Sequence, residues 1–151
     1  MSDIIPKRIV IDTNVCLDLF VFRDPRWQHL LDDLASHRVQ AIAKQECKDE
    51  WLAVLRYPHL PITDETRASV HAAFDHHIHI IEADSAPLIT LPVCKDKDDQ
   101  KFLESARDGA AGILITKDKA LLKLAKRIRK MGLFSIETPE QYLQSRLENL
   151  N

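Results

Sequence analysis

Short apolar segments alternate with longer helical patterns along this chain, and this alternation constrains the fold more than any other feature of the sequence. Five runs of mainly apolar, β-branched residues predict strands at 8–11, 39–43, 78–81, 113–115 and 134–136. Strands that alternate with helices form parallel sheets that are covered on both faces. We therefore expect an α/β protein, a three-layer α/β/α sandwich with a four- to five-stranded, mainly parallel sheet.

The segments between these runs carry apolar residues at helical spacing. They predict helices over 15–22, 26–36, 46–56, 63–76, 99–110, from 118 through 131, and from 139 onward. Thr63 and Thr138 are expected to cap the helices that follow them, and Gly112 and Gly132 to close two others. Residues 87–98 are expected to form a loop.

Length and composition indicate a single globular domain over 1–151. The chain has 151 residues, of which 45% are hydrophobic and 29% charged. No apolar run approaches the roughly 18 residues of a membrane span, and the N-terminus lacks the apolar segment of a signal peptide. Cys16, Cys47 and Cys94 are widely spaced and are expected to be reduced, buried thiols. We expect a cytoplasmic protein.

Glycine is scarce, and this excludes two ways of binding phosphate. The 3 glycines, Gly109, Gly112 and Gly132, fit neither a P-loop nor a dinucleotide fingerprint. Any phosphate group must therefore be bound by side chains or by metal ions.

Two predicted strands carry an acidic residue at or just beyond their carboxyl ends. Asp12 follows the run Ile9-Val10-Ile11, and Asp118 follows Ile113-Leu114-Ile115 after two residues. Ligands of open parallel sheets bind outside the carboxyl ends of the strands, so the two acids converge there if the strands are neighbours. The alternative is that each aspartate only caps the helix that follows it.

Three further acids lie on or beside the apolar faces of predicted helices. Glu50 shares a stripe with Cys47 and Trp51, where a carboxylate is costly unless it is paired or bound to metal. Asp99 faces the same way as Phe102, and Asp96 lies one turn earlier, within reach of the same site. A surface position or an arginine partner for Glu50, and helix capping for Asp96 and its neighbour Asp98, remain open alternatives.

Carboxylates that converge raise one another's pKa, and a divalent cation removes this conflict. Sites built from oxygen ligands suit Mg²⁺ or Mn²⁺. Such ions activate water and neutralise charge on a phosphoryl group. Acidic ligands with metal are thus a second way to bind phosphate, and they need no glycine.

Four motifs, in this order, resemble the PIN domain family. They are Asp12-Thr13-Asn14 after a strand, Glu50 before Val54-Leu55 and Tyr57-Pro58, Asp96-x-x-Asp99 with Phe102-Leu103, and Thr116-Lys117-Asp118 with Leu121-Leu122. The most similar branch contains toxin components of toxin–antitoxin systems similar to VapC. The resemblance covers nearly the whole chain.

The resemblance implies an Mg²⁺- or Mn²⁺-dependent endoribonuclease. Position by position, it assigns catalytic roles to Asp12, Glu50, Asp99 and Asp118. The same four residues and Asp96 would bind metal, and Asn14 and Thr116 would support them. One departure is Lys44, at the start of the helix of Glu50, where this branch often has serine. The branch also implies an RNA substrate, a cognate antitoxin and a homodimer.

Positive charge is concentrated in one segment although the net charge is only −2. Residues 117–130 hold seven lysines and arginines against the single acid Asp118. Lys117, Lys119 and Lys123 are the proposed RNA-binding residues, and Lys95, Lys97 and Lys101 are expected to add to them. The alternative is a solvated surface helix. His76, His77 and His79 straddle a helix end and a strand, so a shared metal ion is not expected.

Two other functions remain open at this stage. A PIN-like scaffold that binds RNA or protein without cleavage keeps the fold but needs no acid set. A metal-dependent phosphatase of the haloacid dehalogenase type also begins with a strand and an aspartate. That class needs a second acid two residues later, where this chain has Asn14.

Overall fold

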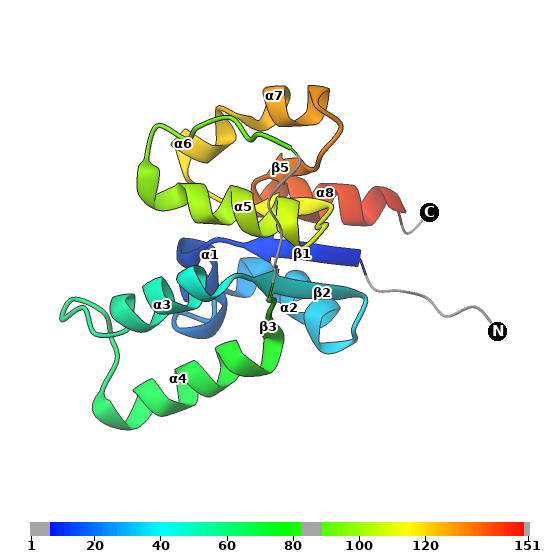
Figure 1. The fold of residues 1–151 in the computed structure, drawn as a ribbon. Coiled ribbons are helices and arrows are strands. Elements are labelled where there is room, and N and C mark those ends of the chain that lie inside the picture. Colours follow the sequence, from blue (N-terminus) through cyan, green and yellow to red (C-terminus); the bar gives the residue numbers. More distant parts are fainter. Residues whose placement is uncertain (1–6, 83–88, 150–151) are drawn as a thin grey trace.

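The sheet is parallel throughout and has five strands in the order β3-β2-β1-β4-β5. The computed structural model describes residues 7–82 and 89–149, with the side chains of 148 and 149 left out. The strands are β1 (Lys7–Ile11), β2 (Val39–Ala43), β3 (Ile78–Ile80), β4 (Ile113–Ile115) and β5 (Ser135–Glu137). The expected α/β/α sandwich is confirmed, and β1 lies at its centre (Figure 1).

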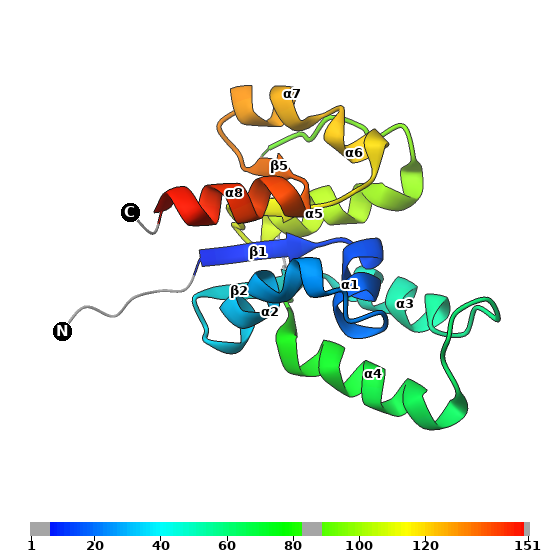
Figure 2. The same ribbon diagram turned by 180° about the vertical axis from the view of Figure 1, so that it is seen from behind.

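The helices connect the strands and cover both faces of the sheet. They are α1 (Thr13–Phe20), α2 (Gln28–Ala35), α3 (Gln45–Val54), α4 (Asp64–His77), α5 (Gln100–Asp108), α6 (Lys119–Leu122), α7 (Ala125–Lys130) and α8 (Pro139–Asn149), with 3₁₀ turns η1 (Pro25–Trp27) and η2 (Lys97–Asp99). Helix α5 packs on one face, and α2 and α8 pack on the other, as the two opposite views show (Figures 1 and 2).

The two central strands are buried because helices cover both of their faces. Val10 and Leu114, which pair across β1 and β4, are completely buried. Trp51 stacks on Phe74 with ring centroids 4.8 Å apart, and Trp27 is also buried, so both tryptophans belong to the core. The three cysteines are buried and free, also as expected.

The single helix expected from Asp118 through Met131 is wrong, because the chain forms α6 and α7 instead. At the break, the Leu124 N–H donates to the Leu121 oxygen, three residues back, which tightens the turn. This turn allows both short helices to pack against β5. Gly132, with a φ of 70°, follows α7 as expected.

Helix α5 ends earlier than expected. Its last residue is Asp108, and Gly109 rather than Gly112 follows it. A Cβ on Gly109 would lie 1.9 Å from Ile42 Cδ1, so any larger residue here would displace the end of the Ile42 side chain. Ala110, the last residue of the expected helix, lies outside α5 and is exposed.

Two other predictions concern the loop and the caps. Of the expected loop at 87–98, residues 87 and 88 lie outside the described residues, and its end forms the turn η2. Thr63 and Thr138 cap α4 and α8 as expected. No helix in the described part of the chain has the length and apolar character needed to cross a membrane.

Candidate active site

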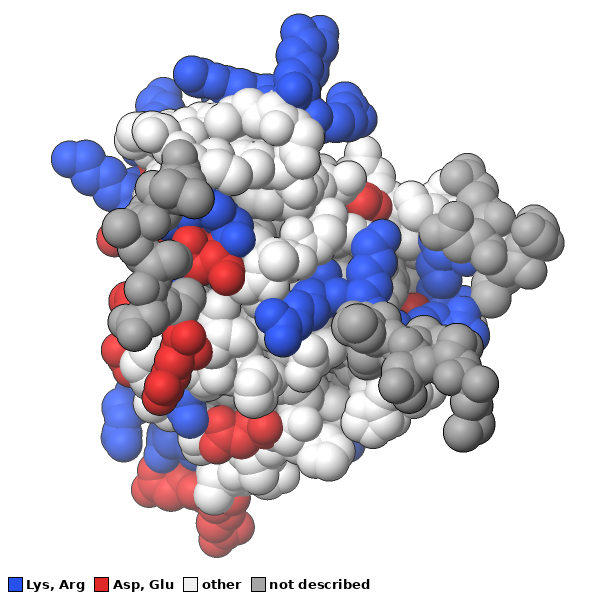
Figure 3. Space-filling view, turned by 45° about the vertical axis from the view of Figure 1, so that its right-hand side comes forward, with Lys and Arg blue, Asp and Glu red and all other residues white. Residues whose placement is uncertain are grey.

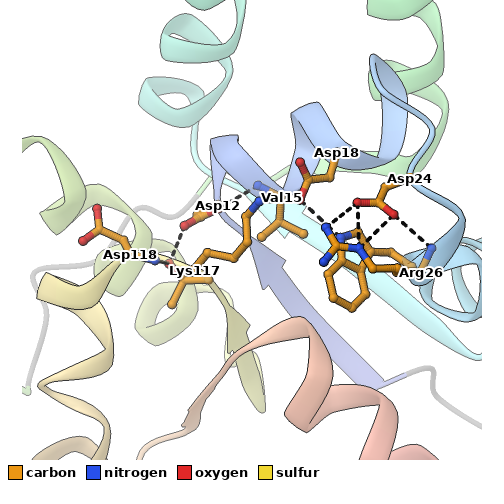
Figure 4. A network of polar contacts seen from close by, with 9 residues as sticks. Asp12, Val15, Asp18, Asp24, Arg26, Lys117 and Asp118 are labelled. Atoms are coloured by element: carbon orange, nitrogen blue, oxygen red, sulfur yellow. Dashed lines mark hydrogen bonds and ion pairs between the residues drawn. The ribbon is translucent and has the colours of Figure 1, made fainter.

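The carboxyl ends of β1 and β4 lie side by side, and each leads into an aspartate. The Asp12 N–H donates to the backbone oxygen of Ile115, which brings the ends of the two strands together. Asp12 Oδ1 accepts from the Val15 N–H at 3.0 Å, and Asp118 Oδ1 accepts from the Ala120 N–H at 2.8 Å. Both aspartates therefore cap helices, and both line one cavity. Figure 4 shows their side chains near each other, beside Lys117.

This acidic cavity has a volume of about 230 Å³ and collects the acids that the sequence singled out. Its walls come from α1, α3, the η2–α5 segment and the β4–α6 connection. They consist of Asp12, Thr13, Asn14, Glu50, Val54, Asp96, Asp98, Asp99, Phe102 and Asp118. Glu46, one turn before Glu50 on α3, is exposed and is not part of these walls.

Three of the carboxylates form a closer group. Asp96, Asp99 and Asp118 each offer an oxygen such that all three atoms lie within 4.8 Å of one another. Asp96 is exposed and caps η2, whereas Asp99 and Asp118 are half-buried. Asp99 Oδ2 is buried and has no hydrogen-bond partner. A buried oxygen without a partner is costly, and a bound cation would satisfy it.

Burial and mutual repulsion change the acidity of these groups. Burial, together with Asp118 and Asp96, raises the pKa of Asp99 well above its usual range. The interaction with Asp99 lowers the pKa of Asp118, so Asp99 takes up a proton before Asp118 does. Burial raises the pKa of Asp12 to about 6, although Thr116 and Val15 oppose the shift.

Thr116 joins the ends of the two strands. Its buried hydroxyl donates to Asp12 Oδ2 and accepts from the Asp118 N–H at 2.9 Å. It therefore fixes the position of Asp12 relative to Asp118. Asn14 is exposed and contributes to the cavity wall.

Glu50 lies in the same cavity but has its own partners. Its Oε2 accepts from the Thr13 hydroxyl, and its Oε1 lies 2.9 Å from Lys101 Nζ. The alternative of a paired Glu50 therefore holds, with a lysine in place of an arginine. Sequence reasoning missed Thr13 and placed Lys101 with the RNA-binding lysines. Only its position next to Asp12 in the sequence could have indicated that Thr13 belongs to the site.

The structure also places the three lysines proposed for RNA binding. Lys117 Nζ lies 2.5 Å from Asp18 Oδ2, which also accepts from the Trp27 indole N–H at 3.2 Å (Figure 4). Lys119 and Lys123 are exposed and form no ion pair within the described part of the chain. Lysines and arginines gather at the top of the molecule, where α7 lies, and acids gather along its left side (Figure 3).

The histidines form no comparable group. His37, His76, His77 and His79 line a cavity of about 510 Å³ beside β3, larger than the acidic one. Among the described residues, however, Asp96, Asp99 and Asp118 are the only three metal-ligating side chains that come within 4.8 Å of one another. The chemistry of the donors, rather than the size of the cavity, indicates the site.

The carboxylates group beyond the carboxyl ends of the central strands of an open parallel α/β sheet, which is where such domains bind their ligands. A family model described as PIN domain matches residues 8–120, and the chain belongs to this family. PIN domains are generally nucleases that use divalent metals and act on RNA. No curated protein matches the chain.

Proposed function

We propose that this protein is a divalent-metal-dependent endoribonuclease that hydrolyses RNA phosphodiester bonds. The observation that carries the proposal is the group formed by Asp96, Asp99 and Asp118, whose oxygens lie within 4.8 Å of one another in a PIN domain. Hydrolysis of a phosphodiester needs a water nucleophile and a means of neutralising phosphate charge, and glycine loops are missing from this sequence.

The residues present fit a hard divalent cation such as Mg²⁺ or Mn²⁺. All donors are carboxylate oxygens, and the buried Asp99 Oδ2 has no other partner. Asp96, Asp99 and Asp118 would hold the ion, Asp12 is a further proposed ligand, and Glu50 faces this group from another wall of the same cavity. When bound, the ion supplies a more acidic water and stabilises negative charge on the phosphate.

The protein's own groups orient this chemistry. Thr116 holds Asp12 beside Asp118. Thr13 and Lys101 hold Glu50 at the opposite wall, where its carboxylate can orient a water for in-line attack on the phosphate. We propose products with 5′-phosphate and 3′-hydroxyl ends, as in related nucleases.

We propose that RNA reaches the cavity along the cationic side of α6 and α7. Lys119 and Lys123 are exposed and form no ion pair within the described part of the chain, so they can contact phosphates. Lys117 lies next to Asp118 and takes part after exchanging Asp18 for a phosphate oxygen. Arg129 and Lys130 extend the same charge along α7.

The test is cleavage of end-labelled RNA with Mn²⁺ by the Asp12→Asn variant. Asparagine caps helices as well as aspartate does, so the fold should persist while cleavage is lost. Asp49→Asn, on the exposed side of α3, is the matched control and should cleave normally. Cleavage by Asp12→Asn at the wild-type rate would reject the proposal, and a wild-type protein that binds RNA without cleaving it would favour the scaffold alternative.

We further propose that the protein is a cytoplasmic toxin of a toxin–antitoxin pair, with residues 1–151 as one domain that forms a homodimer. The support is the resemblance of its motifs to that branch, together with α8, which packs on β5 and extends the sheet's cover past residue 120. Induced expression should arrest growth, and Asp12→Asn should not. Co-expression of the neighbouring reading frame should restore growth.

A further inference from the structure

Lys101 lies behind the wall of the acidic cavity, and its ammonium contacts three of the wall residues, Glu50, Asp98 and Phe102. Its Nζ is 2.9 Å from Glu50 Oε1 and also donates to the backbone oxygen of Asp98. The same nitrogen lies over the ring of Phe102, 5.4 Å from the ring centroid. Only 17% of the Lys101 side chain is exposed. This cation is therefore fixed between α3 and α5 and is not available to steer RNA.

Both carboxylate oxygens of Glu50 already have a partner in this arrangement. Lys101 occupies Oε1 and the Thr13 hydroxyl occupies Oε2. Ion pairs shielded from water are stronger than exposed ones, because the surrounding dielectric constant is lower. A metal ion that bound Glu50 would have to compete with the ammonium for the negative charge of this carboxylate.

The three grouped aspartates of the cavity, unlike Glu50, have no positively charged partner among the described residues. Asp96, Asp99 and Asp118 bring their oxygens together without a cation among them, and Asp99 Oδ2 has no partner. Glu50 is not a member of this group. Glu50 thus has an ammonium as its partner, whereas the group of three aspartates forms no ion pair with the described residues.

We propose that Lys101 is a positioning residue that serves as the built-in counter-ion of Glu50, so that the cavity takes up one divalent cation rather than two. This inference rests on the proposed function, because it treats the acidic cavity as a metal centre. Two-ion centres hold their ions roughly 3.5–4 Å apart and need carboxylates for both. Here the carboxylate that would serve a second ion is bound to an ammonium.

A covalently attached cation has a functional consequence. The Lys101 ammonium cannot dissociate, so Glu50 stays oriented by Lys101 and Thr13 at any metal concentration. Metal activation should then follow the filling of a single site, without a second, weaker phase.

The test counts Mn²⁺ bound per chain by equilibrium dialysis, with electron paramagnetic resonance of the free ion, on the full-length protein. We expect one ion for the wild type and two for Lys101→Met, in which Glu50 is released. Lys101→Met combined with Glu50→Gln should return to one ion. Lys97→Met removes an exposed lysine at the same distance in sequence from Asp99 and should also bind one.

Two results overturn the proposal: two tightly bound ions in the wild type, or one ion in a folded Lys101→Met variant. Thermal unfolding in EDTA establishes that each variant is folded. If Lys101→Met does not fold, the Mn²⁺ binding of the Glu50→Gln variant alone tests the proposal. It should bind one Mn²⁺ with nearly wild-type affinity, and a loss of more than about tenfold would make Glu50 a ligand and overturn the proposal. A wild type that binds no Mn²⁺ contradicts the proposed function itself.

Discussion

Two carboxylates lie in opposite electrostatic situations in this molecule. Asp33 in α2 is 2% exposed, and its oxygens accept from the Tyr142 hydroxyl at 2.7 Å and from Arg146 Nε at 2.9 Å. Asp99 is less buried, yet one of its oxygens has no partner and its neighbours are other acids. The first arrangement is complete and holds α2 to α8. The second is incomplete without a cation, and we therefore interpret the first as structural and the second as functional.

The largest difference between the two acids should appear in catalysis. Asp99→Asn should lower Mn²⁺-dependent RNA cleavage on the order of 100-fold or more, because a proposed ligand is lost. Asp33→Asn should leave the rate per folded molecule unchanged, since Asp33 lies away from the acidic cavity. The measurement is single-turnover cleavage at saturating enzyme. Equal losses in both variants would erase the distinction.

The two substitutions should affect stability in the reverse order, with the larger loss in Asp33→Asn. Asp33→Asn leaves Arg146 and Tyr142 facing an uncharged group and should lower the free energy of unfolding by about 3 kcal/mol. Asp99→Asn should leave it unchanged or raise it in EDTA, because it removes repulsion with Asp118 and Asp96. Urea unfolding in EDTA compares the two variants. Destabilisation of Asp99→Asn to the same extent as Asp33→Asn would contradict this interpretation.

A pH dependence distinguishes the acidic cavity further. The pKa of Asp12 is raised from 3.8 to about 6, so the folded state binds its proton more tightly than the unfolded state does. The stability that this proton contributes is fully present below about pH 4 and is lost as the pH rises through about 6. Metal-free wild type should therefore lose stability over that interval relative to Asp12→Asn. Parallel stability curves for the two proteins between pH 4 and 7 would contradict the shift.

The smallest effects are expected at the cationic rim. Lys123→Met should weaken RNA binding uniformly across sequences and reduce the slope of log affinity against log salt by about one. Asp18→Asn releases Lys117 and should strengthen RNA binding slightly. Filter binding at several salt concentrations measures both effects. A salt slope unchanged by Lys123→Met would place that lysine outside the RNA path.

Sequence reasoning predicted the fold well where the chain's own pattern determines it. The strands 39–43 and 113–115 were predicted to the residue, because apolar runs there end abruptly at polar residues. The common location of Asp12 and Asp118 followed from parallel pairing of β1 and β4. The break between α6 and α7 was not predicted, since their apolar spacing continues through it.

The sequence did not predict which side chains pair with the acidic residues. Glu50 and Lys101 meet because α3 and α5 pack together, and no local pattern marks their contact. The same holds for Lys117 and Asp18, which come from the β4–α6 connection and α1. Spacing places a side chain on a face, but its partners depend on how distant elements pack.

The central claim is that Asp99 and its neighbours form a cation site that is electrostatically incomplete without its ion. Thermal unfolding of wild type and Asp99→Asn, each with EDTA and with Mn²⁺, tests it most directly. We predict that Mn²⁺ raises the melting temperature of the wild type and not of Asp99→Asn, and that Asp99→Asn melts no lower than the wild type in EDTA. An equal rise with Mn²⁺ in both proteins, or none in the wild type, would contradict the claim.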